Sequence, residues 1–201
     1  MKEFEELDFN HIRELIEQKE ANSIKEILAD LHPADIAELC DELDVEEARF
    51  IYLQLDNETA AEVLTEMDED ARKDILDTLP SETIAKKFVD YMDTDDAVDI
   101  IRETDEEKQE EVLSHIEDIE QAGDIVDLLK YDEDTAGGLM GTEMVIVKEN
   151  WSMPECLREM RMQAEEMDEI YYVYVVDDEE RLRGVFPLKH MITSPSVSKV
   201  K

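Results

Sequence analysis

Basic residues are scarce in this chain, which has 20 Lys+Arg against 57 Asp+Glu and a formal net charge of −37 over 201 residues. Nucleic acids and anionic lipid surfaces need cationic contacts, so the charge argues against both as partners. It favours cations as partners, or solubility alone. Because like charges repel within a compact fold, divalent cations that bind the folded chain should stabilise it.

Cysteine is nearly absent. Cys40 and Cys156 are far apart and belong to no CxxC motif, so neither a disulfide framework nor a zinc site is indicated. Each lies among apolar helical positions, which predicts a role in core packing.

Long apolar runs are also missing, since no segment approaches the roughly 20 apolar residues of a membrane span. The first residues, Met1–Glu6, do not form a signal peptide, because no apolar stretch follows a basic one. We therefore expect a soluble, cytosolic chain, which can still be the soluble part of a membrane protein.

Catalytic motifs are lacking too. The sequence contains no GxSxG, HExxH, P-loop or GxGxxG pattern, and its four histidines are scattered. The acidic stretch Asp93–Asp99 lacks the central glycine and terminal glutamate of an EF-hand loop. These absences predict that the chain is not an enzyme.

The first two thirds of the chain is a repeat. Leu31, Leu55 and Leu79 begin similar segments 24 residues apart, and a half-repeat of 12 adds Leu43 and Met67. After Tyr91 the register slips by one residue and continues as Met92, Thr104 and Ile116. Each unit reads as two helices of about 10 residues, with leading helices in 1–18 and 22–31 and closing helices in 107–116 and 120–131. Helices this short need stacked neighbours, so an α superhelix of short helices is predicted.

Polar residues between the helices indicate where each helix begins. We expect the N-caps to be Asp44, Asn57, Asp68, Ser81, Thr94 and Thr104. Pro33 and Pro80 suit the start of a helix, where a missing N–H does little harm. His32, beside Pro33, is expected to have the same structural role.

The last third alternates between strand and helix patterns. Strands are predicted at 144–147, 170–176 and 181–186, with a polar turn at 177–180. A Ser152-x-x-Glu155 capping box should start a helix over 154–162, and a second helix can begin at Pro187. The predicted order is strand, helix, strand, strand, helix.

Ten residues join these halves: Asp134–Glu143, with the sequence DTAGGLMGTE. The adjacent Gly137 and Gly138 suggest backbone freedom at a change of direction. This segment closely resembles the junction between the N domain and the first CBS motif of MgtE-type magnesium channels. The 24-residue repeat is similar to the N domain of that family, a right-handed superhelix, and the pattern YVVD…RLxGV…L in 174–188 resembles its CBS motif.

The resemblance implies three domains of sequence: a helical superhelix at 1–131, a linker at 132–143, and a first CBS motif, one half of an α/β CBS-type domain, at 144–201. It also implies a cytosolic region that closes its N and CBS domains together when Mg²⁺ is plentiful and thereby shuts a transmembrane pore. That pore belongs to the same protein but lies outside this chain. CBS pairs of the family dimerise, so a homodimer through the CBS region is expected, with residues 1–130 alone monomeric.

The family's Mg²⁺-sensing carboxylates fall here on Glu62, Asp95 and Asp99. Asp95 and Asp99 are four residues apart, which places both on one side of a helix. For Asp95, stabilisation of a first helical turn by the helix dipole explains the residue equally well. Mg²⁺ is the expected ion because one or two carboxylates and several waters suffice to hold it.

An alternative function remains open: a helical scaffold with a CBS module that senses a nucleotide. Tyr172 would then stack on the base, but the interpretation we favour for this residue is a strand aromatic packed in the core. The family commonly has Arg-Asp at the positions that Lys189 and His190 occupy here. In the family pattern the aspartate would bind the ribose of the nucleotide.

Overall fold

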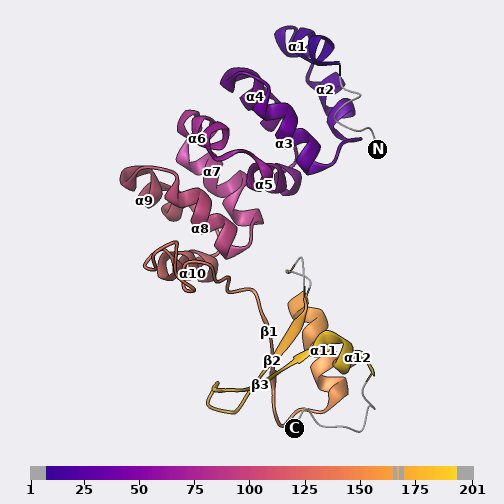
Figure 1. The fold of residues 1–201 in the computed structure, drawn as a ribbon, viewed down its shortest axis with the longest axis vertical. Coiled ribbons are helices and arrows are strands. Elements are labelled where there is room, and N and C mark those ends of the chain that lie inside the picture. The colour runs from indigo at the N-terminus through magenta and orange to yellow at the C-terminus, as the bar shows by residue number, and fades with distance from the viewer. Residues whose placement is uncertain (1–7, 165–166, 168–169, 194–201) are drawn as a thin grey trace. The chain divides into compact units, whose positions relative to one another are not determined.

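The computed structural model describes residues 8–164, 167 and 170–193, which divide into a helical unit ending at Met140 and an α/β unit beginning at Gly141 (Figure 1). Within the described ranges, no helix combines the length and the hydropathy required to cross a bilayer.

The helical unit is a succession of short helices. They are α1 (Phe9–Glu17), α2 (Ala21–Leu28), α3 (Pro33–Asp41), α4 (Val45–Tyr52), α5 (Asn57–Glu66), α6 (Glu69–Thr78), α7 (Ser81–Lys87), α8 (Thr94–Arg102), α9 (Glu106–His115) and α10 (Ile119–Leu128), with a 3₁₀ turn η2 (Val89–Tyr91) after α7.

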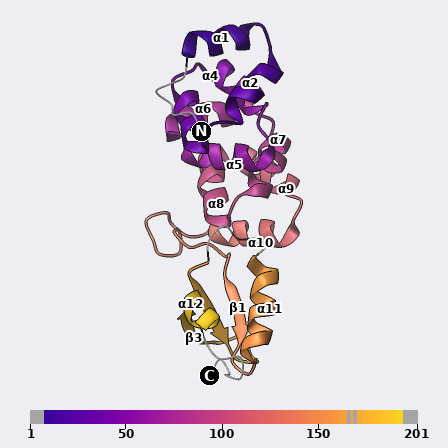
Figure 2. The ribbon, with the colours of Figure 1, turned by 90° about the vertical axis from the view of Figure 1, so that its right-hand side faces the viewer.

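Helices that occupy the same half of the repeat pack on one another. Thus α3 packs against α5, α5 against α7 and α7 against α9, while α4 packs against α6 and α8 against α10. Figures 1 and 2 show the helices stacked in chain order along this unit. Each helix covers the apolar side of its neighbours, as expected for a repeat array whose members are too short to be stable alone.

The register of the repeat is confirmed by burial. Leu31, Leu55, Met67 and Leu79 are buried, and Leu43 is partly buried. Tyr91 is 51% exposed, whereas Met92, Thr104 and Ile116 are buried, so the slip occurs at the predicted place. The 3₁₀ turn η2 lies between α7 and α8, at this place in the chain.

Four of the six predicted N-caps are wrong by one residue. Asp44 and Asp68 are N-caps as expected, but Asp56, Pro80, Asp93 and Asp105 cap α5, α7, α8 and α9 in place of Asn57, Ser81, Thr94 and Thr104. Thr104 instead donates its hydroxyl to the carbonyl of Ile101 at 2.8 Å, after the end of α8. A cap residue must lie before the first helical residue, and an aspartate directly precedes the predicted residue at Asn57 and Thr94. At Thr104 the capping aspartate, Asp105, is the next residue.

The helix starts at Pro33 and Ser152 follow the prediction. Pro33 is the first residue of α3, and Nδ1 of His32 accepts a hydrogen bond from the backbone N–H of Ala34 at 3.4 Å. Glu155 accepts hydrogen bonds from the backbone N–H of Ser152 at 2.8 Å and from its hydroxyl at 2.7 Å. These bonds close the first turn of the helix Met153–Gln163.

The α/β unit has the predicted order of elements. It consists of β1 (Val145–Lys148), α11 (Met153–Gln163), β2 (Tyr172–Val176), β3 (Leu182–Pro187) and α12 (Leu188–Thr193). β1 pairs with β2 in parallel and β2 with β3 antiparallel, which gives the sheet order β1-β2-β3. The side chain of Asp177 holds the β2–β3 turn by accepting from the backbone N–H groups of Glu179 and Arg181.

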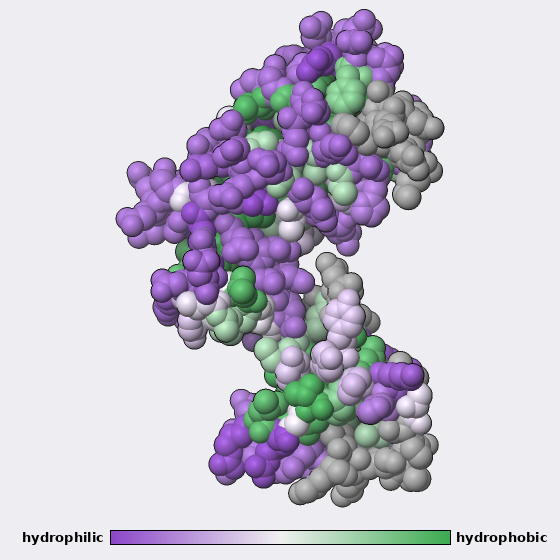
Figure 3. Space-filling model, in the orientation of Figure 1, coloured by the Kyte–Doolittle hydropathy of each residue, from purple (hydrophilic) through white to green (hydrophobic). Residues whose placement is uncertain are grey.

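One face of the sheet carries a small core. Val145, Val147, Val173 and Val175 pack with Cys156 of α11. Cys40 is buried in the core of the helical unit, so both cysteines have the predicted packing role. The alternate residues of the sheet are more exposed, and Figure 3 shows hydrophobic residues at the surface of this unit and a mostly hydrophilic surface on the helical unit.

Gly137 and Gly138 are needed for a different reason than the backbone freedom expected from the sequence. Neither Gly137 nor Gly138 has a positive φ. Space is what both positions lack: a Cβ at Gly137 would lie 2.4 Å from Cδ1 of Tyr131, and one at Gly138 would lie 2.3 Å from the carbonyl oxygen of Asp132. The glycines therefore permit a close fold of 131–138 on itself.

Candidate functional site

The acidic pair Asp95 and Asp99 lies on α8, whose amphipathic sequence determines how both are placed. Ala97, Val98, Ile100 and Ile101 are buried. Asp95, in the first turn, is partly buried, and Asp99, one turn later, is exposed. The two carboxylates thus share the side of α8 away from the core, as predicted, and are close enough in sequence to repel each other.

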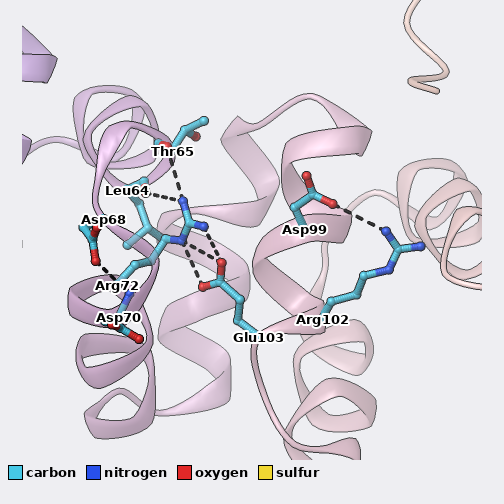
Figure 4. Close-up of polar contacts among 8 residues, drawn as sticks. All are labelled: Leu64, Thr65, Asp68, Asp70, Arg72, Asp99, Arg102 and Glu103. Atoms are coloured by element: carbon cyan, nitrogen blue, oxygen red, sulfur yellow. Dashed lines mark hydrogen bonds and ion pairs between the residues drawn. The ribbon is translucent and has the colours of Figure 1, made fainter. Parts of the chain in front are cut away.

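Asp99 already has a cationic neighbour, which the sequence analysis missed. Nη1 of Arg102 lies 3.5 Å from Oδ1 of Asp99 (Figure 4). The side chain of Asp99 is 61% exposed, whereas that of Arg102 is only 12% exposed. A 3.5 Å contact to a carboxylate that is mostly in solvent contributes little stability, so a divalent cation can compete for the carboxylate. The signal in the sequence is the i,i+3 spacing of Asp99 and Arg102.

Glu62 belongs to a different part of the helical unit. It is exposed on α5 between the buried residues Ala61 and Val63. It lines a groove of about 520 Å³ together with Lys25 of α2 and Asp56. The structure thus places Asp95 and Asp99 on one helix and puts Glu62 on a groove formed by earlier helices.

The end of α8 is fixed to α5 and α6 by a largely buried ion pair. Nε of Arg72 lies 3.0 and 2.9 Å from the two carboxylate oxygens of Glu103, and Nη1 donates to the carbonyls of Leu64 and Thr65 at 3.3 Å each (Figure 4). The hydrogen bond to Glu103 raises the pKa of Arg72. This pair holds the helix that carries the acidic site but, being engaged on both sides, is not itself a cation site.

The sequence analysis also missed Asp90, a partly buried acid outside the Asp95–Asp99 pair. Burial, followed by the negative charges of Glu117 and Asp118, raises the pKa of Asp90. Asp90 and Glu117 line a cavity of about 480 Å³ with Lys86. A partly buried carboxylate near others is costly to keep charged, and nothing in the linear spacing of these residues indicates their proximity.

Tyr172 lies at the first position of β2 and is 54% exposed, so it does not belong to the core of the described α/β unit. Across the antiparallel pair it is opposite Pro187, the residue before α12, whose second and third residues are Lys189 and His190. An exposed ring beside a basic helix can stack on a planar ligand.

The two folds define the class of this protein: an array of short helical repeats followed by one strand–helix–strand–strand–helix module. Residues 31–134 match the family model of the MgtE intracellular N domain, and residues 136–196 match that of the CBS domain. The chain belongs to the MgtE family.

Relatives of known name agree with this assignment. The magnesium transporter MgtE of Thermus thermophilus is 44% identical over 73 residues, which are 36% of this chain and 16% of that protein. The magnesium transporter MgtE of Enterococcus faecalis is 41% identical over 75 residues, which are 37% of this chain and 17% of that protein. The matched segments therefore span less than a fifth of these relatives' length. Both relatives are transporters rather than enzymes, in agreement with the sequence analysis.

Solved structures agree over nearly the whole chain. The cytosolic domain of the Mg²⁺ channel MgtE in complex with ATP superposes with a TM-score of 0.85 at 30% identity, covering 96% of this chain and 78% of that one. The soluble part of a magnesium transporter gives a TM-score of 0.79 at 29% identity, covering 96% and 75%. The superhelix and CBS-type fold expected from the sequence are thereby confirmed.

Proposed function

We propose that this chain is the Mg²⁺-sensing region of an MgtE-like magnesium channel and that it lies at the cytoplasmic face of the membrane. The observation that carries the proposal is the Asp95–Asp99 pair on the outer side of α8, within an MgtE N-domain fold of large negative charge. Hard carboxylate oxygens on a solvent-facing surface suit an ion that retains several of its waters.

Mutual repulsion supplies the mechanism. Without Mg²⁺, the acidic surface of the helical unit repels other carboxylates, and a divalent ion between two such surfaces turns repulsion into attraction. If the closed arrangement of the N and CBS domains binds Mg²⁺ more tightly than the open one, rising Mg²⁺ shifts the population to the closed form. In the full-length protein that closure would shut the pore.

Homodimerisation through the CBS region belongs to the same proposal. The sheet exposes apolar residues such as Ile146, Tyr172 and Val185, while the helical unit presents a hydrophilic surface (Figure 3). A pore that two subunits form together needs such an association. The helical unit by itself should stay monomeric because its acidic surface repels a second copy.

Calorimetric titration of this chain with MgCl₂, at constant ionic strength, tests the binding step. Asp95→Asn with Asp99→Asn should weaken Mg²⁺ binding about tenfold or more, because both hard anionic ligands are lost. The matched control is Glu106→Gln with Glu110→Gln, which removes two exposed acids at the same i,i+4 spacing on α9.

Equal loss of affinity in the two double variants would mean that Mg²⁺ responds only to overall charge. Unchanged affinity in the Asp95/Asp99 variant would show that these two are ordinary solvated acids. A triple variant that adds Glu62→Gln to Asp95→Asn and Asp99→Asn tests whether Glu62 contributes separately to Mg²⁺ affinity.

A second function is favoured by the nucleotide in the related structure. The cytosolic MgtE domain with 30% identity was solved with ATP, and the Tyr172 ring is exposed here. If the CBS module senses nucleotide, Tyr172→Ala should lower ATP affinity about fivefold or more, since stacking on a base contributes roughly 1–3 kcal/mol. Tyr171→Ala, at the neighbouring exposed tyrosine, is the control. Equal ATP affinity in all three proteins would exclude stacking at Tyr172.

A further inference from the structure

Arg102 occupies a junction between the acidic site and the end of the helical array. Its guanidinium lies 3.5 Å from Oδ1 of Asp99 through Nη1, while Nη2 donates to the carbonyl of Tyr131 at 2.7 Å and to that of Leu128 at 3.4 Å. One nearly buried side chain therefore touches the exposed carboxylate of α8, the carbonyl of the last residue of α10 and the carbonyl of Tyr131, three residues further on.

The three contacts differ in strength. The bond to Tyr131 is short, and the carbonyl of Leu128 lies at a helix C-terminus, where a cation is favoured. The contact to Asp99 is long, and that carboxylate is mostly exposed. The Asp99 contact is thus the one that a competing cation can replace.

Tyr131 passes this connection on to the segment that follows. Its backbone N–H donates to the carbonyl of Leu128 at 3.0 Å, and its ring lies against Gly137 so closely that a Cβ there would overlap it. Thr135 accepts from the N–H of Gly138 at 3.0 Å and completes the turn. Tyr131 thus contacts Arg102 through its backbone carbonyl and Gly137 through its ring.

We propose that Arg102 is a positioning residue that couples Mg²⁺ occupancy at Asp99 to the Tyr131 turn and, through it, to the Gly137-Gly138 segment. The inference rests on the proposed function, because it takes Asp99 as a Mg²⁺ ligand. A bound ion withdraws the carboxylate from Arg102 and repels the guanidinium, which then depends wholly on the carbonyls of Leu128 and Tyr131. The effect of Mg²⁺ binding at Asp99 is thus transmitted through one continuous set of contacts.

The test is an NMR titration of the ¹⁵N-labelled chain with MgCl₂ at constant ionic strength. In the wild type, the amides of Asp95–Asp99 and those of Tyr131, Gly137 and Gly138 should shift along one common binding curve. In Arg102→Gln, the first group should still shift, at a Mg²⁺ concentration about two- to fivefold lower because a competing cation is gone. The shifts of Tyr131, Gly137 and Gly138 should be lost.

The control for charge is Lys130→Gln, which removes one positive charge beside Tyr131 from a residue that pairs with Asp127. It should leave both sets of shifts as in the wild type. Arg102→Lys serves if Arg102→Gln does not fold: a single ammonium keeps the charge but not the fork that reaches acceptors on two sides. It should leave the Asp95–Asp99 curve within about twofold and reduce the Gly137 shift by about half or more.

The outcomes separate the two claims. Shifts at Asp95–Asp99 with none at Tyr131 and Gly137 in the wild type would overturn the coupling and leave the proposed function intact. Shifts at Gly137 that persist unchanged in Arg102→Gln and Arg102→Lys would also overturn it. A titration in which Asp95–Asp99 do not respond at all would overturn both.

Discussion

At the scale of single residues, Gly137 and Gly138 are constrained by contact. Gly138→Ala would bring a methyl group against backbone atoms of Asp132, which cannot move independently, whereas Gly137→Ala would meet the half-exposed ring of Tyr131. We expect Gly138→Ala to cost about 1–3 kcal/mol of unfolding free energy and Gly137→Ala less. Chemical denaturation followed by circular dichroism measures both.

Gly123→Ala is the internal control for these variants. It lies within α10, and a Cβ there would meet nothing within 4 Å. The substitution should stabilise the protein by about 0.5–1 kcal/mol, because alanine has the higher helix propensity. A loss of stability at Gly123 equal to that at Gly138 would indicate that crowding is not the cause.

The pKa of Asp90 gives a prediction with a definite sign. Burial and the nearby acids raise it above the ordinary value, so the folded state binds the proton more readily than the unfolded state. The charged carboxylate therefore destabilises the fold at pH values above the raised pKa, and this cost disappears as the pH falls through that pKa toward the unfolded value.

Asp90→Asn should accordingly raise the melting temperature at pH 7 by about 1–3 °C. The amide oxygen can still accept the hydrogen bond that the backbone N–H of Glu117 donates to Asp90 at 3.1 Å. The advantage should shrink as the pH is lowered toward 4. An asparagine variant that melts lower than the wild type at pH 7 would contradict the assigned cause.

At the scale of elements, the start of α5 distinguishes the N-cap from its neighbour. Asp56 accepts hydrogen bonds from the backbone N–H and the hydroxyl of Thr59 at 3.0 and 2.9 Å. Asp56→Ala should cost about 1 kcal/mol, while Asn57→Ala should change the free energy of unfolding much less. Urea denaturation of the two variants measures this difference, and a larger loss at Asn57 would restore the N-cap predicted from the sequence.

Scarce cations are used at helix ends throughout the helical unit. Lys87 donates to the carbonyl of Leu55 at 2.6 Å, Lys108 donates to that of Leu76, and Arg72 and Arg102 reach similar carbonyls. The contacts of Lys87, Lys108 and Arg102 join segments of different repeats, while the carbonyl contact of Arg72 joins α6 to α5. Each gives a carbonyl near a helix end an additional donor. In an acidic chain these few basic residues thus contribute to the stacking of the array.

The Arg72–Glu103 pair is where this use of charge should matter most, since the two side chains are only 14% and 10% exposed. Glu103→Gln leaves the guanidinium partly buried without its counter-charge, so we expect a loss of about 2–4 kcal/mol in unfolding free energy. Asp127→Asn breaks the mostly exposed pair with Lys130 and should change stability by about 0.5 kcal/mol or less. Similar losses for both would mean that burial does not determine the strength of the pair.

The elements themselves could be predicted because their signals are local. The 24-residue recurrence of Leu31, Leu55 and Leu79 located the repeats, and the alternating run before Asp177 located β2. The roles of Arg72 and Arg102 could not be predicted, since their partners Glu103 and Tyr131 lie about 30 residues away and become neighbours only when the repeats stack. The acidic pair on α8 was found through its i,i+4 spacing and the family resemblance, whereas Asp90 depended on burial.

At the scale of the whole molecule, the charge of −37 means that closing any two parts of the protein brings carboxylates together. Monovalent salt only screens this repulsion, whereas a bound divalent ion reverses it locally. A protein with this composition is therefore suited to respond to the concentration of Mg²⁺, provided that ligands such as Asp95 and Asp99 are held on a folded surface.

The most direct test is Mg²⁺ flux through the full-length protein, measured in membrane vesicles as a function of Mg²⁺ on the side that carries this region. The wild type should close as Mg²⁺ rises into the millimolar range, while Asp95→Asn with Asp99→Asn should remain open at concentrations about tenfold higher. Glu106→Gln with Glu110→Gln should close like the wild type. Closure of the Asp95/Asp99 variant at the unchanged Mg²⁺ concentration would contradict the account.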